Sequence, residues 1–121
     1  ELEALPICDS YPRFDFIFLG MGPDGHICSL FPGFPQLEDT THWVTFILNS
    51  PKPPSDRVTL TLPVVNNARN VFVIATGASK RPIIASVLEG NSTLPIARVH
   101  PTHGKLLWFL DDEAKPYLVC L

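Results

Sequence analysis

Asp24 and His26 are the residues of this sequence whose types and spacing most directly suggest chemistry. They lie two positions apart in the segment Gly20–His26, where three glycines and a proline predict a tight loop. An imidazole titrates near neutral pH and can take a proton from water, so His26 is a candidate general base. Asp24 could orient that imidazole or hold a substrate hydroxyl. The alternative is a plain β-turn, because Pro-Asp-Gly favours turns and His26 could cap a short helix.

The element that must position this pair is an apolar run over residues 14–19, which has the length of a buried strand. Open α/β sheets bind their ligands at the carboxyl ends of such strands. After the loop, residues 29–31 are predicted to form a short helical turn that stops at Pro32. The loop is therefore the first candidate site.

Lys52 and Arg57 flank a proline-rich stretch, residues 49–56, which we expect to be stiff and partly extended. Two cations held by such a loop suit an anionic group such as phosphate, which arginine binds through its forked guanidinium. Two solvated surface charges are the alternative. A weaker candidate is the turn at residues 76–80, whose amides at the start of a helix could receive an anion or a sugar hydroxyl.

The composition describes one globular domain over residues 1–121. The chain is 45% hydrophobic and 17% charged, which excludes extended disorder. Its net charge is −3 and it has no basic run, so nucleic acid is not expected as a partner. The apolar runs are strand-sized, so no membrane-spanning helix is predicted. No basic and apolar leader occurs in the first residues, so nothing predicts secretion.

The cysteines and histidines do not form a recognisable metal or disulfide pattern. The three cysteines are odd in number and form no Cys-x-x-Cys pair, which suits a reducing compartment. Among the four histidines only His100 and His103 are close together, and both fall in a proline-flanked loop. We therefore predict no metal site.

The rest of the sequence alternates predicted strands with loops and helices. Strands are expected at 42–48, 57–62, 70–76 and 105–110, from their β-branched, aromatic and leucine content. In the strand at 57–62 the apolar residues alternate with threonines, which predicts a half-buried strand.

Helices are expected after the last two of these strands. One should run from an N-cap at Ser79 to about Glu89 and close at Gly90. Another should start at Asp111. Because a helix follows a strand at 70–89 and again at 105–119, part of the sheet should be parallel, and the fold class is α/β.

Four blocks of the sequence together resemble the soluble, cytosolic 6-phosphogluconolactonases, and they cover residues 14–110. The blocks are LGMGPDGHICSLFPG, SPKPPSDRVTLTLPVVNNAR, FVIATGASK and LPIARVHPTHGKLLWFLD. The resemblance implies a cytoplasmic protein with a Rossmann-like fold, a largely parallel sheet flanked by helices. Glucosamine-6-phosphate deaminases share that fold.

The resemblance also implies a carboxylic ester hydrolase that converts 6-phosphoglucono-δ-lactone to 6-phosphogluconate in the oxidative pentose phosphate pathway. Its partner would be this sugar-phosphate lactone, with no metal or organic cofactor. His26 falls on the histidine proposed to activate water, and Asp24 on the neighbouring acid. Lys52 and Arg57 fall on the basic pair of the second block, where a contact with the substrate phosphate is expected.

Gly22 and Gly25 are hypothesised to bind the reacting group. A lactone carbonyl is already electrophilic, so one base and donors for the tetrahedral oxyanion can suffice. The amides around these glycines are candidate donors. The phosphate, remote from the reacting carbon, would supply binding energy that orients the ring.

Two departures from the family accompany the resemblance. The usual chain is considerably longer, and its N-terminal half carries a glycine–serine phosphate loop and an Asp-Glu-Arg segment that are absent here. We therefore expect an N-terminally truncated domain. The block before the last strand usually reads Pro-His-Thr-Gly, whereas this chain has Thr102-His103, so no role is assigned to a histidine there.

Two alternatives to the lactonase prediction stay open. A non-catalytic fragment that only packs or dimerises is favoured by the missing half. A sugar-phosphate deaminase or isomerase is less favoured, because its loop typically continues toward Asn-Glu-Pro where this chain has Ser29-Leu30-Phe31-Pro32. The sequence does not predict the oligomeric state.

Overall fold

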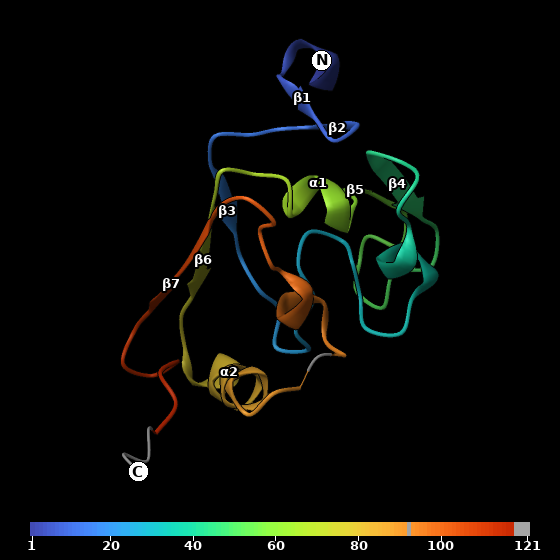
Figure 1. Cartoon of the computed structure of the whole chain (residues 1–121). Coiled ribbons are helices and arrows are strands. Elements are labelled where there is room, and N and C mark those ends of the chain that lie inside the picture. The colour runs from blue at the N-terminus through green and yellow to red at the C-terminus, as the bar shows by residue number, and fades with distance from the viewer. Residues whose placement is uncertain (92, 118–121) are drawn as a thin grey trace.

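The computed structural model describes residues 1–91 and 93–117. At its centre is a three-stranded parallel sheet in the order β3-β6-β7 (Figure 1). The strands are β3 (Ile17–Leu19), β6 (Asn70–Ala75) and β7 (Lys105–Leu110). The middle strand, β6, pairs with β3 at residues 71–73 and with β7 along its whole length. The predicted parallel sheet and α/β class are therefore confirmed.

The connections around this sheet carry the shorter elements. Between β3 and β6 lie η2 (Pro35–Glu38), the antiparallel pair β4 (Val44–Ile47) and β5 (Arg57–Leu60), and α1 (Leu62–Val65). Between β6 and β7 lie η3 (Ala78–Lys80), α2 (Arg81–Leu88) and η4 (Pro95–Arg98). The chain begins with η1 (Leu2–Ala4) and the pair β1 (Ile7–Cys8) and β2 (Tyr11–Pro12). No helix in the described ranges is long and apolar enough to cross a membrane.

One face of the parallel sheet forms the hydrophobic core. In β6, Val71, Val73 and Ala75 are buried, whereas Phe72 is half-buried and Ile74 is exposed. Side chains of a strand alternate between the two faces of a sheet, so the apolar run of β6 supplies both. Figure 1 shows the helices on one side of the sheet, to its right in that view. Helices formed by the described residues therefore cover one face of the sheet.

The strand predicted at 57–62 is present as β5, but part of its predicted orientation is wrong. Leu60 packs partly buried against the core, as expected, yet Val58 is 77% exposed. Thr59 and Thr61 are buried in its place. Their hydroxyls donate to backbone carbonyls, Thr61 Oγ1 to His42 at 2.7 Å and Thr59 Oγ1 to Leu60 at 2.9 Å. A hydroxyl with such a partner can be buried at little cost.

The helical turn predicted at residues 29–31 is wrong. Ile27 and Leu30 instead form an antiparallel bridge, with the Leu30 amide donating to the Ile27 carbonyl at 2.8 Å. Between them the backbone reverses at Cys28, whose φ is 49°. A tight reversal leaves no room for a helical turn.

The α2 helix begins one residue later than predicted. Arg81 is its first residue and Lys80 takes the N-cap position without a side-chain cap, so Ser79 is not the cap. The short η3 turn occupies the predicted first turn. The predicted end is confirmed, because Gly90 adopts a φ of 100° and its amide donates to the Val87 carbonyl.

No helix starts at Asp111 in the part of the chain that is described. Its Oδ1 accepts the Ala114 amide at 2.8 Å, and residues 112–114 form turns. A carboxylate used in this way closes a turn after β7. Residues 118–119 of the predicted helix lie outside the described ranges.

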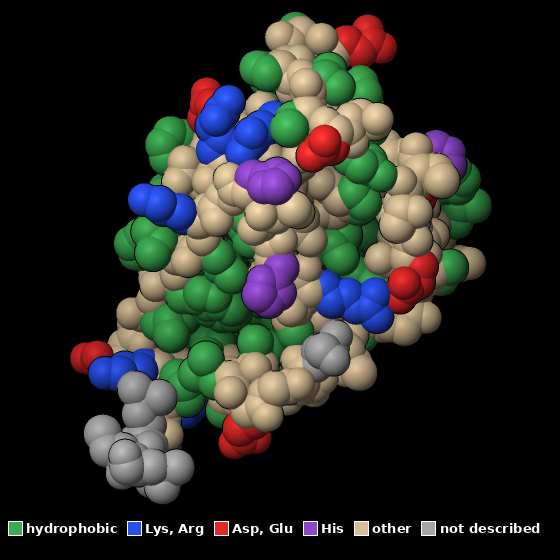
Figure 2. All heavy atoms as spheres, in the orientation of Figure 1, with side chains coloured by type: hydrophobic (Ala, Val, Ile, Leu, Met, Phe, Trp, Pro, Cys, Tyr) green, Lys and Arg blue, Asp and Glu red, His purple; other side chains and the backbone are tan. Residues whose placement is uncertain are grey.

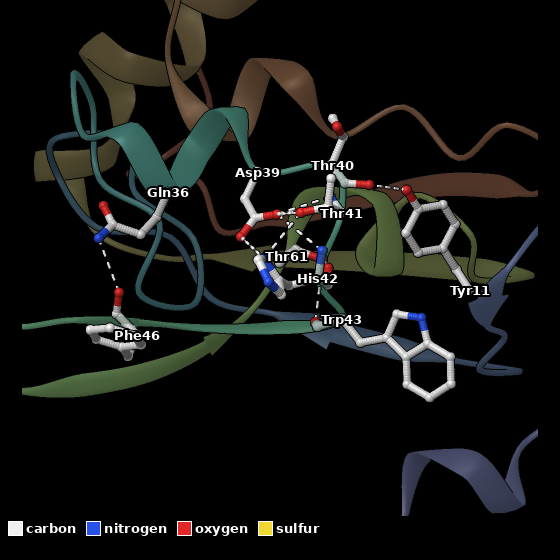
Figure 3. Close-up of polar contacts among 9 residues, drawn as sticks. All are labelled: Tyr11, Gln36, Asp39, Thr40, Thr41, His42, Trp43, Phe46 and Thr61. Carbon is white, nitrogen blue, oxygen red and sulfur yellow. Dashed lines mark hydrogen bonds and ion pairs between the residues drawn. The ribbon is translucent and has the colours of Figure 1, made fainter.

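The Asp39 carboxylate anchors the turn that leads into β4 (Figure 3). It accepts the Thr41 and His42 amides at 3.0 Å each, and its other oxygen lies 2.9 Å from His42 Nδ1. The hydrogen bonds from these two amides lower the pKa of Asp39 to about 2. Nearby, Tyr11 donates to the Thr40 carbonyl. This anchored turn fixes the start of the strand pair that carries Arg57.

Candidate active site

The loop after β3 brings Asp24 and His26 together. His26 Nδ1 lies 2.6 Å from Asp24 Oδ1, and the His26 amide donates to the same oxygen at 3.1 Å. The side chain of His26 is 16% exposed and that of Asp24 is 35% exposed. Because the carboxylate accepts the Nδ1 proton, Nε2 of the neutral imidazole is the nitrogen with a lone pair to accept another proton.

The charge of Asp24 suits this arrangement. Burial raises its pKa, but the hydrogen bonds from the His26 side chain and amide outweigh burial, and the pKa lies below its ordinary value of 3.8. Asp24 is therefore an anion at neutral pH. An ionised carboxylate only accepts hydrogen bonds, so it fixes the tautomer and the orientation of the imidazole.

Gly22 and Gly25 determine how the loop folds. The Gly22 amide donates to the His26 carbonyl and the Gly25 amide to the Gly22 carbonyl, both at 3.0 Å. A Cβ at Gly22 would lie 2.1 Å from His26 Nδ1, so only glycine leaves room for the ring. Gly25 has a φ of 84°, a region that favours glycine. Both of these amides donate within the loop, so they are not free to donate to an oxyanion, and a role for other amides around these glycines stays a prediction.

Phe31 links the loop to the cation predicted at residue 57. Its ring is fully buried, with a centroid 4.6 Å from that of the His26 ring. Arg57 Cζ lies 5.4 Å from the same Phe31 centroid. The buried ring therefore contacts the candidate base and the candidate phosphate ligand. The sequence pattern did not predict this role, although Phe31 belongs to the same sequence block as His26.

Arg57 also holds the proline loop in place. Its Nε donates to the Pro54 carbonyl at 3.0 Å, and its Nη2 donates to the carbonyls of Lys52 and Pro53 at 3.1 and 2.9 Å. The Nη1 group has no hydrogen-bond partner among the described residues, so it can bind an anion. Lys52 lies half-buried on the same loop, and the structure gives no contact between its side chain and His26.

Thr59 ties β5 to the segment after His26. Its Oγ1 accepts the Ser29 amide at 3.1 Å. The strand that begins at Arg57 is thereby fixed against the turn that follows the histidine. This contact was not predicted from the sequence, because the alternation of apolar residues and threonines predicted an outward side chain for Thr59.

One amide of the predicted anion site at residues 76–80 is bound by the protein itself. The Gly77 amide donates to both carboxylate oxygens of Asp111, at 3.1 and 3.2 Å. The amides of Ala114 and then Gly77 lower the pKa of Asp111. Asp111 therefore takes the place of an external anion at the Gly77 amide, and binding of an anion or a sugar hydroxyl by the other amides of the turn stays a prediction.

Other polar groups lie away from the loop. A hollow of 460 Å³ contains an Arg98–Glu38 ion pair of 2.6 Å, and none of the predicted site residues lines it. His103 Nε2 is 3.9 Å from Asp9, a long contact. Within residues 1–91 and 93–117, no group of three His, Cys, Asp or Glu residues could hold a metal ion.

The fold and the site together define the class of protein: an α/β protein whose parallel sheet carries an acid–histidine loop at the end of a strand. Residues 1–108 match the family described as glucosamine-6-phosphate isomerases/6-phosphogluconolactonase, and the chain belongs to this family.

Among curated proteins, the chain is similar to lactonase members of this family. The chain is 54% identical over 108 residues to the 6-phosphogluconolactonase of Bos taurus, and 50% identical over 109 residues to the probable 6-phosphogluconolactonase 1 of Arabidopsis thaliana. These matches cover 88% and 85% of the chain, but 42% and 41% of the relatives. The chain thus spans about two fifths of the length of these relatives.

Solved structures show the same similarity. The 6-phosphogluconolactonase of Leishmania guyanensis superposes with a TM-score of 0.80 at 30% identity, over 93% of this chain and 47% of that one. The enzyme of Trypanosoma brucei gives 0.76 at 34% identity, over 85% and 41%. The resemblance found in the sequence is thereby confirmed.

Proposed function

We propose that this chain carries the catalytic loop of a 6-phosphogluconolactonase and takes part in the hydrolysis of 6-phosphoglucono-δ-lactone to 6-phosphogluconate. The observation that carries the proposal is the 2.6 Å contact between Asp24 and His26 Nδ1, which leaves Nε2 as the proton acceptor. The names of the relatives supply the substrate.

In the proposed reaction, Nε2 of His26 takes a proton from water as the water oxygen attacks the lactone carbonyl. The carbonyl becomes a tetrahedral oxyanion, which then collapses and breaks the bond to the ring oxygen. The proton held by His26 passes to that leaving oxygen, giving the open-chain acid. The Asp24 carboxylate stabilises the imidazolium that forms between the two steps.

The proposed phosphate ligands are Arg57 and Lys52. The Nη1 group of Arg57 supplies two N–H donors, and the carbonyls that bind Nε and Nη2 keep the guanidinium in place. Because Phe31 separates the guanidinium from the imidazole, a phosphate at Arg57 would sit apart from the reacting carbon. Binding energy from that remote group orients the ring.

Two further proposals concern the surroundings of the protein. The absence of a basic run argues against a nucleic-acid partner. The odd number of cysteines suits a reducing compartment, and from this we infer a cytoplasmic location. Fractionation of cells that express a tagged chain tests the location.

The experiment for the proposed function is the hydrolysis of 6-phosphoglucono-δ-lactone by the purified chain, measured against the spontaneous rate. We expect the chain to accelerate hydrolysis of the lactone. We expect no deamination of glucosamine 6-phosphate, because residues 29–32 contain no carboxylate. A rate equal to the spontaneous one would show that this chain alone is a non-catalytic fragment. Ammonia release would favour the deaminase alternative.

A further inference from the structure

The backbone is strained close to the candidate base. Cys28, two residues after His26, has a φ of 49° although it is not a glycine. For a residue with a side chain this left-handed conformation costs free energy, and it persists only where the surrounding structure holds it. The contacts made by the turn at residues 27–30 therefore decide whether the chain keeps its course after the histidine.

A hydroxyl on another element holds the middle of this turn. The Leu30 amide closes the turn on itself by donating to the Ile27 carbonyl at 2.8 Å. The Ser29 amide instead donates to Thr59 Oγ1, at 3.1 Å. That hydroxyl gives its own proton to the Leu60 carbonyl at 2.9 Å, so it presents a lone pair to the Ser29 amide. Both Ser29 and Thr59 are buried, and a buried amide needs such an acceptor.

Arg57 gives the same strand a second contact with the histidine segment. It lies two residues before Thr59 on β5, and residues two apart on a strand project from the same face. Its guanidinium contacts the Phe31 ring, which packs on the His26 ring. Figure 2 shows Lys and Arg side chains at several separate places on one face of the molecule. Phosphate binding therefore depends on individually placed cations such as Arg57, and β5 fixes the position of this one relative to His26.

We propose that Thr59 is a positioning residue for lactone hydrolysis, whose hydroxyl holds the strained turn and so keeps His26 at a fixed distance from Arg57. The proposal rests on the proposed function, in which His26 takes a proton from water and Arg57 binds the phosphate. Because both groups act on one substrate molecule, their separation determines whether the activated water faces the carbonyl once the phosphate is bound. Without the hydroxyl, the buried Ser29 amide would lack an acceptor, and the turn would shift to reach another one.

The test compares Thr59→Val, which replaces the hydroxyl by a methyl group of similar size, with Thr59→Ser, which keeps the hydroxyl. The rate of lactone hydrolysis is measured per folded molecule. We expect Thr59→Val to lower kcat by about ten- to a hundredfold, with KM within a few-fold of wild type, and Thr59→Ser to restore kcat. Ser86→Ala is the matched control, because it removes a half-buried hydroxyl of α2 whose partner is Asn91, and it should leave kcat unchanged.

A second measurement needs no substrate. The nuclear Overhauser contacts between the rings of His26 and Phe31, whose centroids lie 4.6 Å apart, should weaken in Thr59→Val and persist in Thr59→Ser. If the wild-type chain does not accelerate hydrolysis, the proposed function fails, and the ring contacts alone decide whether Thr59 positions His26. Wild-type ring contacts in Thr59→Val, a wild-type kcat in that variant of an active chain, or an equal loss in Thr59→Ser would each overturn the proposal. If Thr59→Val does not fold by circular dichroism, Thr59→Ala makes the same test.

Discussion

At the scale of single residues, the site depends on how His26 is held. Asp24 accepts its Nδ1 proton, the buried Phe31 ring packs against the imidazole, and Gly22 leaves space beside it. Each contact restricts the orientation of Nε2. A base that is held in one orientation needs no reorganisation when it takes a proton, which is how positioning contributes to rate.

Gly22→Ala should remove activity by displacing the imidazole. The new Cβ would stand 2.1 Å from Nδ1, so the ring or the loop must move, and we expect a loss of about a hundredfold in rate. Gly20→Ala is the matched control, since a Cβ there meets nothing within 4 Å. The measurement is lactone hydrolysis per folded molecule, and equal rates for the two variants would contradict the steric role of Gly22.

Asp24→Asn should lower the rate while leaving the loop in place. Loss of the carboxylate removes the preference for a proton on Nδ1, and comparable changes in acid–histidine pairs cost about 10²- to 10⁴-fold. Asp9→Asn changes an exposed acid–histidine pair, with His103, and should leave the rate per folded molecule unchanged. An Asp24→Asn rate within a few-fold of wild type would rule out an orienting role.

At the scale of elements, the strand pair β4–β5 and its connecting loop carry two of the six predicted site residues, Lys52 and Arg57. Arg57, at the start of β5, donates to the proline loop, and Thr59 fixes the strand to the segment after the histidine. The hydrogen bonds from Arg57 thus hold the proline-rich segment in a fixed position relative to β5. Residues far apart in sequence meet at the Phe31 ring because of this packing.

Arg57→Lys should weaken substrate binding more than the chemical step. A lysine keeps the charge but cannot make the three carbonyl contacts and a forked phosphate contact together. We expect KM to rise by about tenfold with a smaller change in kcat. Arg69→Lys is the control, because Arg69 makes an exposed ion pair with Asp15. A fall in kcat with KM unchanged would contradict a binding role.

Asp39 should make stability depend on pH in the acid range. Its pKa is about 2 in the folded chain against an ordinary 3.8, so its stabilisation is present above pH 3.8 and is lost as the pH falls toward 2. Urea unfolding at pH 6 and pH 3 measures this loss. The Asp39→Asn variant should show a smaller drop between the two, and an equal drop would contradict the assignment.

Local patterns predicted those elements whose formation depends on neighbouring residues. The apolar runs gave β3, β6 and β7, and the glycine loop gave the acid–histidine pair. Contacts across long sequence separations could not be predicted in this way. Thr59 faces inward, where its hydroxyl accepts the Ser29 amide, and Asp111 binds the Gly77 amide at the turn where an anion was expected.

At the scale of the whole molecule, the helices of residues 1–91 and 93–117 cover one face of the parallel sheet. The chain contains the loop with Asp24 and His26 and the proline loop that Arg57 holds, while its match covers about two fifths of the length of its relatives.

The measurement that tests the central claim most directly is the rate of 6-phosphoglucono-δ-lactone hydrolysis above the spontaneous rate, for wild type and for His26→Ala. We expect His26→Ala to lose about 10²- to 10⁴-fold. His42→Ala, whose side chain is 68% exposed in the wild type, should stay within a few-fold of it. Full activity in His26→Ala would contradict the assignment of His26 as the base that activates water.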